Sequence, residues 1–194
     1  MPAVLLIAAV LVGPSGAHES GVPRHVLGES VLPRPCRFSE YQILQLAVPG
    51  YDERVHAAET SLAGGDEDFG AYEAAVTAYR FLPLGKRRAR ILVVLVHEIE
   101  SACTDCRNAV VAAIDYTAGA VLQRARLNGN PVQDSLSVQK GPHDGVGITF
   151  RILHVGCCGS GAEETWLLRG RPDEAGNLRF DVPVRVNLKT WGTK

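Results

Sequence analysis

The sequence has no excess of charge of either sign. Its 194 residues carry 20 Lys and Arg against 21 Asp and Glu, which gives a formal net charge of −1 at pH 7. Proteins that bind nucleic acid usually present a broad basic surface, and only the run KRRAR at residues 86–90 is locally basic. That run is typical of a solvated turn between two strands. The composition therefore predicts no nucleic-acid partner.

The sequence also lacks an apolar run long enough to cross a bilayer. The unbroken run at residues 2–13 is too short for a membrane-spanning helix, which needs about 20 residues, and no later segment is longer. Small residues follow the run, as at a signal-peptidase site, although no Lys or Arg precedes it. We therefore expect a signal peptide at residues 1–17 and a secreted or periplasmic protein without a stable membrane span.

Signature motifs of common enzyme classes are missing as well. No G-x-S-x-G nucleophile elbow and no phosphate-binding P-loop occur. His97 and Glu98 begin an H-E-x-x-H zinc-protease motif, but Ser101 stands where the second histidine is needed. GGDEDF at residues 64–69 departs from the GGDEF signature of cyclic-dinucleotide synthases, because Asp68 interrupts it. We assign no catalytic residue and no cofactor, and the sequence favours a protein that is not an enzyme.

What the chain does have is five cysteines. In an exported protein such cysteines usually pair, so the disulfide candidates are Cys36, Cys103, Cys106, Cys157 and Cys158. An odd number leaves at least one outside any internal bridge, and the sequence does not give the connectivity. Adjacent cysteines point to opposite sides of an extended backbone. We therefore predict that one of Cys157 and Cys158 is bridged to the C-x-x-C loop, while the other faces Cys36.

Two other uses of the cysteines stay open. Cys103, Cys106, Cys157 and Cys158, with His154 as an alternative ligand, make a soft ligand set of the kind that zinc prefers. A C-x-x-C pair between a strand and a helix is also the arrangement of a redox dithiol, because the N-terminus of the helix favours the thiolate.

The chain from residue 90 to residue 153 resembles a thioredoxin-like protein. The segment RILVVLVHEIE precedes Cys103 and Cys106, and RLNGNP and GITFRIL follow them. No Trp precedes Cys103, and Thr149 stands where that family usually carries a cis-proline. The resemblance implies a thiol–disulfide oxidoreductase in which a helix starts near Cys106.

Turn residues and apolar periodicity divide the rest of the chain. Prolines and small polar residues mark residues 18–38 as a linker. Ser39 is placed to cap a helix that ends before Gly50, and apolar residues recur at helical spacing over residues 51–63. We therefore expect two short helices before the main body of the protein.

Beyond these helices the pattern changes to that of strands. Residues 72–82 and 90–100 flank a turn with Pro and Gly, and residues 108–127 form a second hairpin about Gly119. A helix over residues 68–82 is an alternative, because Ala and Glu are frequent there. The pattern indicates three further strands, at residues 147–156, 164–170 and 177–186.

These patterns predict an α+β protein. A short helical N-terminal part is followed by a β-rich antiparallel sandwich or barrel of about seven strands, in a single domain over residues 39–194. We interpret the chain as an exported, disulfide-stapled binding or inhibitor module, whose loops 101–107 and 156–161 contact a protein or small-molecule partner. Trp166 is expected in the core. Trp191 is expected to clamp the last strand, with an exposed anchor for a partner as the alternative.

Overall fold

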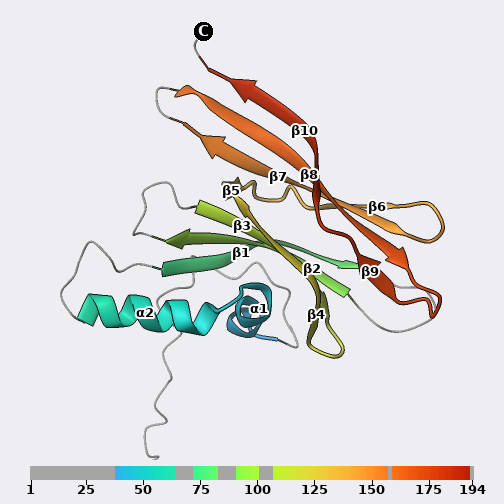
Figure 1. Cartoon of the computed structure of the whole chain (residues 1–194), viewed down its shortest axis with the longest axis horizontal. Coiled ribbons are helices and arrows are strands. Elements are labelled where there is room, and N and C mark those ends of the chain that lie inside the picture. The colour runs from blue at the N-terminus through green and yellow to red at the C-terminus, as the bar shows by residue number, and fades with distance from the viewer. Residues whose placement is uncertain (1–37, 64–71, 83–90, 101–106, 157–158, 193–194) are drawn as a thin grey trace, which may run out of the picture.

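Two helices precede ten strands in the part of the chain that the structure describes (Figure 1). The computed structural model describes residues 38–63, 72–82, 91–100, 107–156 and 159–192. The elements are α1 (Glu40–Ala47), α2 (Tyr51–Ala63), β1 (Tyr72–Leu82), β2 (Ile91–Glu100), β3 (Arg107–Asp115), β4 (Ala120–Asn128), β5 (Asn130–Pro131), β6 (Ser137–Lys140), β7 (Val146–Val155), β8 (Gly161–Pro172), β9 (Leu178–Phe180) and β10 (Val184–Trp191). Their strand pairs are antiparallel. The predicted β-rich α+β class is confirmed.

The first helix begins at the predicted cap. The Ser39 side-chain oxygen accepts a hydrogen bond from the Gln42 N–H at 3.2 Å, and the Gln42 side chain accepts one from the Ser39 N–H at 2.9 Å. This capping box satisfies N–H groups that a helix N-terminus leaves without partners. Gly50 then takes a φ of 68°, which turns the chain into α2. Both predicted helices are therefore confirmed.

The strands form two antiparallel sheets. The first has the order β1-β2-β3-β4, and the second has the order β10-β8-β7-β5, with β6 also paired to β7 and β9 to β8. The predicted hairpins are β1 with β2 and β3 with β4, and Gly119 turns the second one with a φ of 69°. The alternative helix over residues 68–82 is wrong, because residues 72–82 form β1.

The structure adds short strands to those that the sequence indicates. Seven of the ten described strands have eight or more residues, and β5, β6 and β9 are shorter. The segment at residues 177–186, predicted as one strand, is interrupted at residues 181–183. Pro183 has no N–H to donate to a strand ladder. The chain therefore leaves the end of β8 after β9 and rejoins its beginning as β10.

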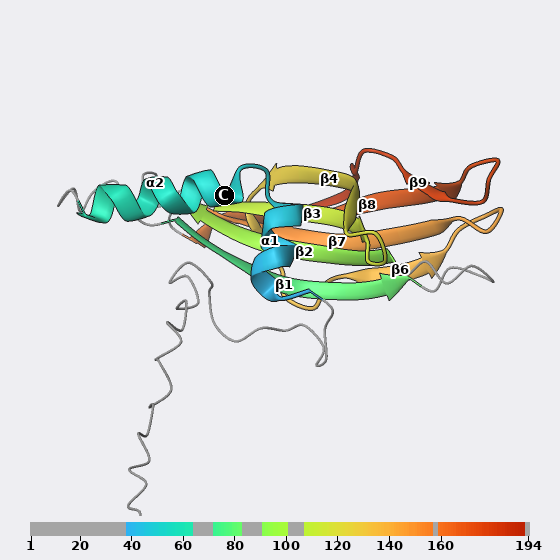
Figure 2. The ribbon, with the colours of Figure 1, turned by 90° about the horizontal axis from the view of Figure 1, so that it is seen from below.

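The first sheet is the middle layer of the molecule. Figure 1 shows the helices below this sheet and the second sheet above it, and in Figure 2, seen from below, α1 lies in front. Val94 and Val96 of β2 belong to the core against the helices, whereas Val93 and Leu95 belong to the core between the sheets. Both faces of β2 are thus covered, which explains its continuous apolar run.

Several sequence predictions lie outside the described residues. They concern the signal peptide at residues 1–17, the linker at residues 18–38 apart from Phe38, and the acidic stretch at residues 64–69. All five cysteines also lie outside the described ranges, so their pairing stays a prediction. Of the two described helices, neither is long and apolar enough to span a bilayer.

Candidate functional site

The strand ends that flank the two cysteine loops lie at one end of the molecule. Arg107, the first residue of β3, accepts a hydrogen bond from the Gly129 N–H at 2.7 Å through its carbonyl oxygen. Gly129 also lies against His154, near the end of β7, because a Cβ at residue 129 would be 2.9 Å from His154 Cε1. The ends of β2 and β3 that flank residues 101–106 therefore lie at the same end of the molecule as the ends of β7 and β8 that flank residues 156–160. We call this the loop end; it lies on the left in Figure 1.

Gly129 is the corner at which the chain passes from the first sheet to the second. It separates β4, which pairs with β3, from β5, where Asn130 pairs with Leu153 of β7. Its φ is 106°, a backbone conformation that side chains with a Cβ rarely adopt. A Cβ would also lie 2.6 Å from Ile152 Cγ2. The absence of a side chain thus allows the two sheets to meet closely at the loop end.

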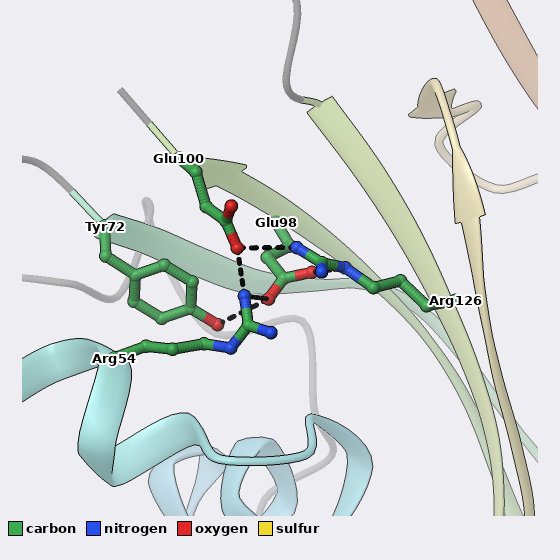
Figure 3. A network of polar contacts seen from close by, with 5 residues as sticks. All are labelled: Arg54, Tyr72, Glu98, Glu100 and Arg126. Carbon is green, nitrogen blue, oxygen red and sulfur yellow. Dashed lines mark hydrogen bonds and ion pairs between the residues drawn. The ribbon is translucent and has the colours of Figure 1, made fainter. Parts of the chain in front are cut away.

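A buried carboxylate lies on the helix-facing side of β2 at this end. Glu98 is fully buried. Its Oε2 accepts a hydrogen bond from Arg126 Nε at 2.7 Å, and its Oε1 accepts one from the Tyr72 hydroxyl at 2.9 Å (Figure 3). Arg54 Nη1 from α2 lies 3.3 Å from Glu98 Oε1. The carboxylate is therefore fully compensated, as a buried charge requires.

A second carboxylate completes this cluster. Glu100 Oε1 accepts a hydrogen bond from Arg126 Nη2 at 2.6 Å and another from Arg54 Nη1. The Arg54 guanidinium also lies 5.9 Å from the centroid of the Tyr72 ring, within reach of a cation–π interaction. Two guanidiniums and two carboxylates, from α2, β2 and β4, thus balance one another. We call these four side chains and Tyr72 the Glu98 cluster.

Two groups of the Glu98 cluster, Tyr72 and Arg126, have raised pKa values. Burial raises the pKa of the Tyr72 hydroxyl, and the Glu98 carboxylate raises it further. Burial alone acts to lower the pKa of Arg126, but Glu98 and Glu100 outweigh burial, so the pKa of Arg126 is raised. Neither group exchanges a proton near neutral pH. The ion pairs of Arg54 with Glu98 and Glu100 therefore fix α2 against the first sheet.

His97 lies next to Glu98 but on the opposite face of β2. Burial lowers the pKa of its imidazole, and the positive charge of Arg107 lowers it further, while a hydrogen bond with Asn130 acts in the other direction. Its Nε2 is buried without a hydrogen-bond partner among the described residues. The folded protein therefore favours the neutral imidazole between the sheets.

We expect this histidine to make the protein less stable in mild acid. Because the pKa of His97 in the folded state is below its unfolded value of about 6.5, protonation favours the unfolded chain. The free energy of unfolding then has its full value above about pH 6.5 and decreases as the pH falls below this value. Urea unfolding between about pH 8 and pH 5 measures this decrease, which should be smaller in His97→Gln. His56→Gln, at an exposed position of α2, should keep the wild-type dependence, and equal dependence in all three proteins would contradict the assignment.

A second buried carboxylate lies on the second sheet. Glu164 Oε1 accepts a hydrogen bond from Arg185 Nη1 at 2.6 Å, and its Oε2 accepts one from Trp166 Nε1 at 2.9 Å. His154 Nε2 lies 3.3 Å from Glu164 Oε2, without the geometry of a good hydrogen bond. Burial acts to raise the pKa of Glu164, but Arg185, Trp166 and His154 outweigh it, so this pKa is lowered. Trp166, predicted in the core, is partly buried and packs against the core between the sheets.

The structure bears differently on the metal hypothesis and on the redox hypothesis that the sequence suggested. Among the described residues, no three His, Cys, Asp or Glu side chains lie close enough to hold a metal ion. His154, the alternative zinc ligand, faces Glu164. The four cysteines of the zinc set lie outside the described residues. The helix that the thioredoxin-like resemblance places near Cys106 is not formed, because residues 107–115 are β3 and its central residues are buried.

Comparison with known proteins identifies no relative. No family model, no curated protein and no solved structure matches this chain.

Sequence reasoning noted Glu98 only within an incomplete zinc-protease motif, and it missed the partners of this residue. Arg54, Tyr72 and Arg126 lie far from Glu98 in the sequence and follow no motif spacing. One signal was available. A carboxylate within a strand as apolar as β2 needs a cationic partner, although the sequence does not say which one.

Proposed function

We propose that the protein is an exported, disulfide-stapled binding or inhibitor module that contacts its partner with loops 101–107 and 156–161. We further propose that its two sheets form a sandwich that presents these loops at one end. The observation that carries the proposal is the contact of Gly129 with both Arg107 and His154. It keeps the strand ends beside the two cysteine loops close together, as a bridge between the loops requires.

An apolar row beside loop 156–161 supports a binding role. Val155 of β7 and Trp191 of β10 both pair with Gly161 of β8, so the three residues form one row across the sheet. The Trp191 ring lies close to Gly161, where a Cβ would be 2.6 Å from Trp191 Cζ2. This contact supports the expected role of Trp191 as a clamp on the last strand. Trp191 is also 45% exposed, as a partner anchor would be.

A thiol–disulfide oxidoreductase is the second candidate, and its support is weaker. A reactive C-x-x-C thiolate is usually stabilised by the N-terminus of a following helix. Here β3 begins at Arg107, directly after Cys106. The structural zinc domain is the third candidate, and it rests on the sequence spacing of the cysteines alone.

Peptide mapping of the exported, non-reduced protein, prepared without chelator, tests the proposal. We expect a bridge between Cys103 or Cys106 and Cys157 or Cys158, whose loss on reduction lowers the free energy of unfolding by about 2–4 kcal/mol. The same digest after reduction and alkylation is the control. An isolated, easily reduced Cys103–Cys106 bridge together with insulin reductase activity would favour the oxidoreductase. Free thiols with one bound metal ion would favour the zinc domain.

The contact surface needs a separate test once a partner is identified. A variant in which both loops are rebuilt with Gly and Ser is expected to lose partner binding. Retention of full binding by a folded variant of this kind would show that the loops are not the contact surface.

A further inference from the structure

β10 is an edge strand with an open side. It ends the order β10-β8-β7-β5, and within the described ranges no strand pairs with its other edge. Its eight residues are all exposed. A long, exposed edge offers unpaired N–H and C=O groups to another strand.

Two other sheet edges, those of β1 and β5, are better protected. β1 carries a bulge between Val76 and Ala78, and the Val76 N–H donates to Glu40 Oε1 at 3.1 Å. β5 has only two residues, and one of them is Pro131. Short strands, bulges and proline are common means of blocking strand addition. β10 also has a bulge at Val186, but its last five residues, 187–191, pair in regular register with β8. This segment is the part best suited to receive a further strand.

The side chains of β10 are suited to an apolar contact. Four of them are between 45% and 50% exposed: Val184, Val186, Leu188 and Trp191. In strand addition, main-chain hydrogen bonds supply affinity and side-chain contacts supply specificity. Trp191, beside loop 156–161, connects this edge to the loop end. An extended segment bound along β10 would therefore reach the proposed contact surface.

The exposed charges beside this edge are positive. Arg185 is 50% exposed, whereas its partner Glu164 is 12% exposed. On β7, one strand beyond β8, Arg151 is 44% exposed, and its partner Glu163 of β8 is 19% exposed. Lys189 of β10 is also exposed, and β10 contains no acidic residue. Cations thus face outward here, although the whole chain has a formal charge of −1.

We propose that β10 accepts an extended, acidic segment of a partner protein as an additional strand of the second sheet. Carboxylates of the segment would lie near Lys189 and Arg185, and its apolar residues would contact Leu188 and Trp191. A second copy of this chain fits less well, because two β10 strands side by side would bring their cations together. The inference rests on the proposed binding function and names the chemical class of its partner.

A random decapeptide library displayed on phage, panned against the full exported protein, tests this inference. We expect selected peptides that combine Asp or Glu with apolar residues, because Lys189 and Trp191 lie on one face of β10 and Leu188 on the other. The tightest of them, made as a free peptide, should slow amide hydrogen exchange at residues 187–191. Its affinity should fall with rising salt, and Lys189→Glu should weaken it about tenfold. Lys140→Glu, the same charge change at an exposed position of β6, should leave it unchanged.

Several outcomes would overturn the inference. They are a library that yields no acidic enrichment, an acidic peptide that leaves exchange in β10 unaltered, and equal effects of the two lysine variants. Concentration-dependent dimerisation that protects β10 would show that a second copy occupies the edge. Peptides that protect only the strand ends beside the loops would leave the proposed function standing without this inference. Peptides that protect β10 and bind the loop-rebuilt variant with full affinity would support strand addition at β10 and contradict the loops as the contact surface.

Discussion

Glu98→Ala is expected to lower the free energy of unfolding by about 3–5 kcal/mol, because it breaks a buried ion pair and leaves two cations, each about one third exposed, without their central partner. Arg126 and Arg54 would retain only Glu100, and the Tyr72 hydroxyl would lose its acceptor. The measurement is urea unfolding at neutral pH, followed by tryptophan fluorescence. Since Arg54 is the link to α2, we also expect faster amide exchange in this helix than in the strands of the second sheet.

Glu163→Ala is the matched control for this prediction. Glu163 is also a strand carboxylate paired with an arginine, since Arg151 Nη1 lies 3.1 Å from its Oε2. It lies nearer the surface than Glu98, and its arginine is largely exposed. A pair of this kind contributes about 0–1 kcal/mol. Similar losses in the two variants would mean that burial of Glu98 does not make its interactions strong.

A double variant separates charge loss from loss of packing volume. Glu98→Leu combined with Arg126→Met replaces an ion pair by apolar side chains of similar size. Such replacements of buried pairs are often neutral or stabilising. We therefore expect the double variant to be more stable than Glu98→Ala, with Arg54 and Glu100 still paired. A double variant as unstable as the single one would indicate that Tyr72 and Arg54 depend on the carboxylate itself.

The parts of the fold that could be predicted are those with local causes. Ser39 and Gln42 form a capping box three residues apart, and Gly119 supplies the positive φ of a tight turn. Alternation of apolar and polar residues marked β7, because only one of its faces meets the core. In each case the signal and the structure that it causes lie within a few residues of one another.

The parts that could not be predicted depend on how the strands meet in space. The Glu98 cluster joins residues from α2, β1, β2 and β4, and only the strand order brings them together. The break between β9 and β10 depends on β8 being long enough to pair with both. The C-x-x-C suggested a helix after Cys106, but β3 lies between two sheet neighbours and two core layers, which favour a strand. Local patterns do not encode these relations.

The position of the strand ends beside the two cysteine loops could be predicted only in part. The sequence suggested it only on the condition that the flanking strands are neighbours. In the structure β2 and β3 belong to one sheet and β7 and β8 to the other, so they are not paired neighbours. The strand ends beside the loops lie at the same end because Gly129 joins the sheets there. The strand ends are thus brought together by a corner between two sheets and not by strand pairing, and this corner can be tested directly.

Gly129→Ala is expected to lower the free energy of unfolding by about 2–5 kcal/mol, from backbone strain and overpacking together. The φ of 106° is unfavourable for alanine, and the new methyl group would lie 2.6 Å from Ile152 Cγ2, whose side chain is fully buried. Gly176→Ala is the control, since Gly176 has a φ of 77° with nothing within 4 Å of a Cβ. It should cost only the conformational part, about 1–2 kcal/mol.

The same variant connects stability to function. If the corner at Gly129 brings the cysteine loops together, Gly129→Ala should reduce the yield of the bridge between them, while Gly176→Ala should leave it at the wild-type level. Peptide mapping of the non-reduced variants gives both yields. An unchanged bridge in a destabilised Gly129→Ala protein would mean that the loops find each other without the corner. Their pairing would then depend on the loops themselves, and the binding surface would tolerate changes in the sheets beneath it.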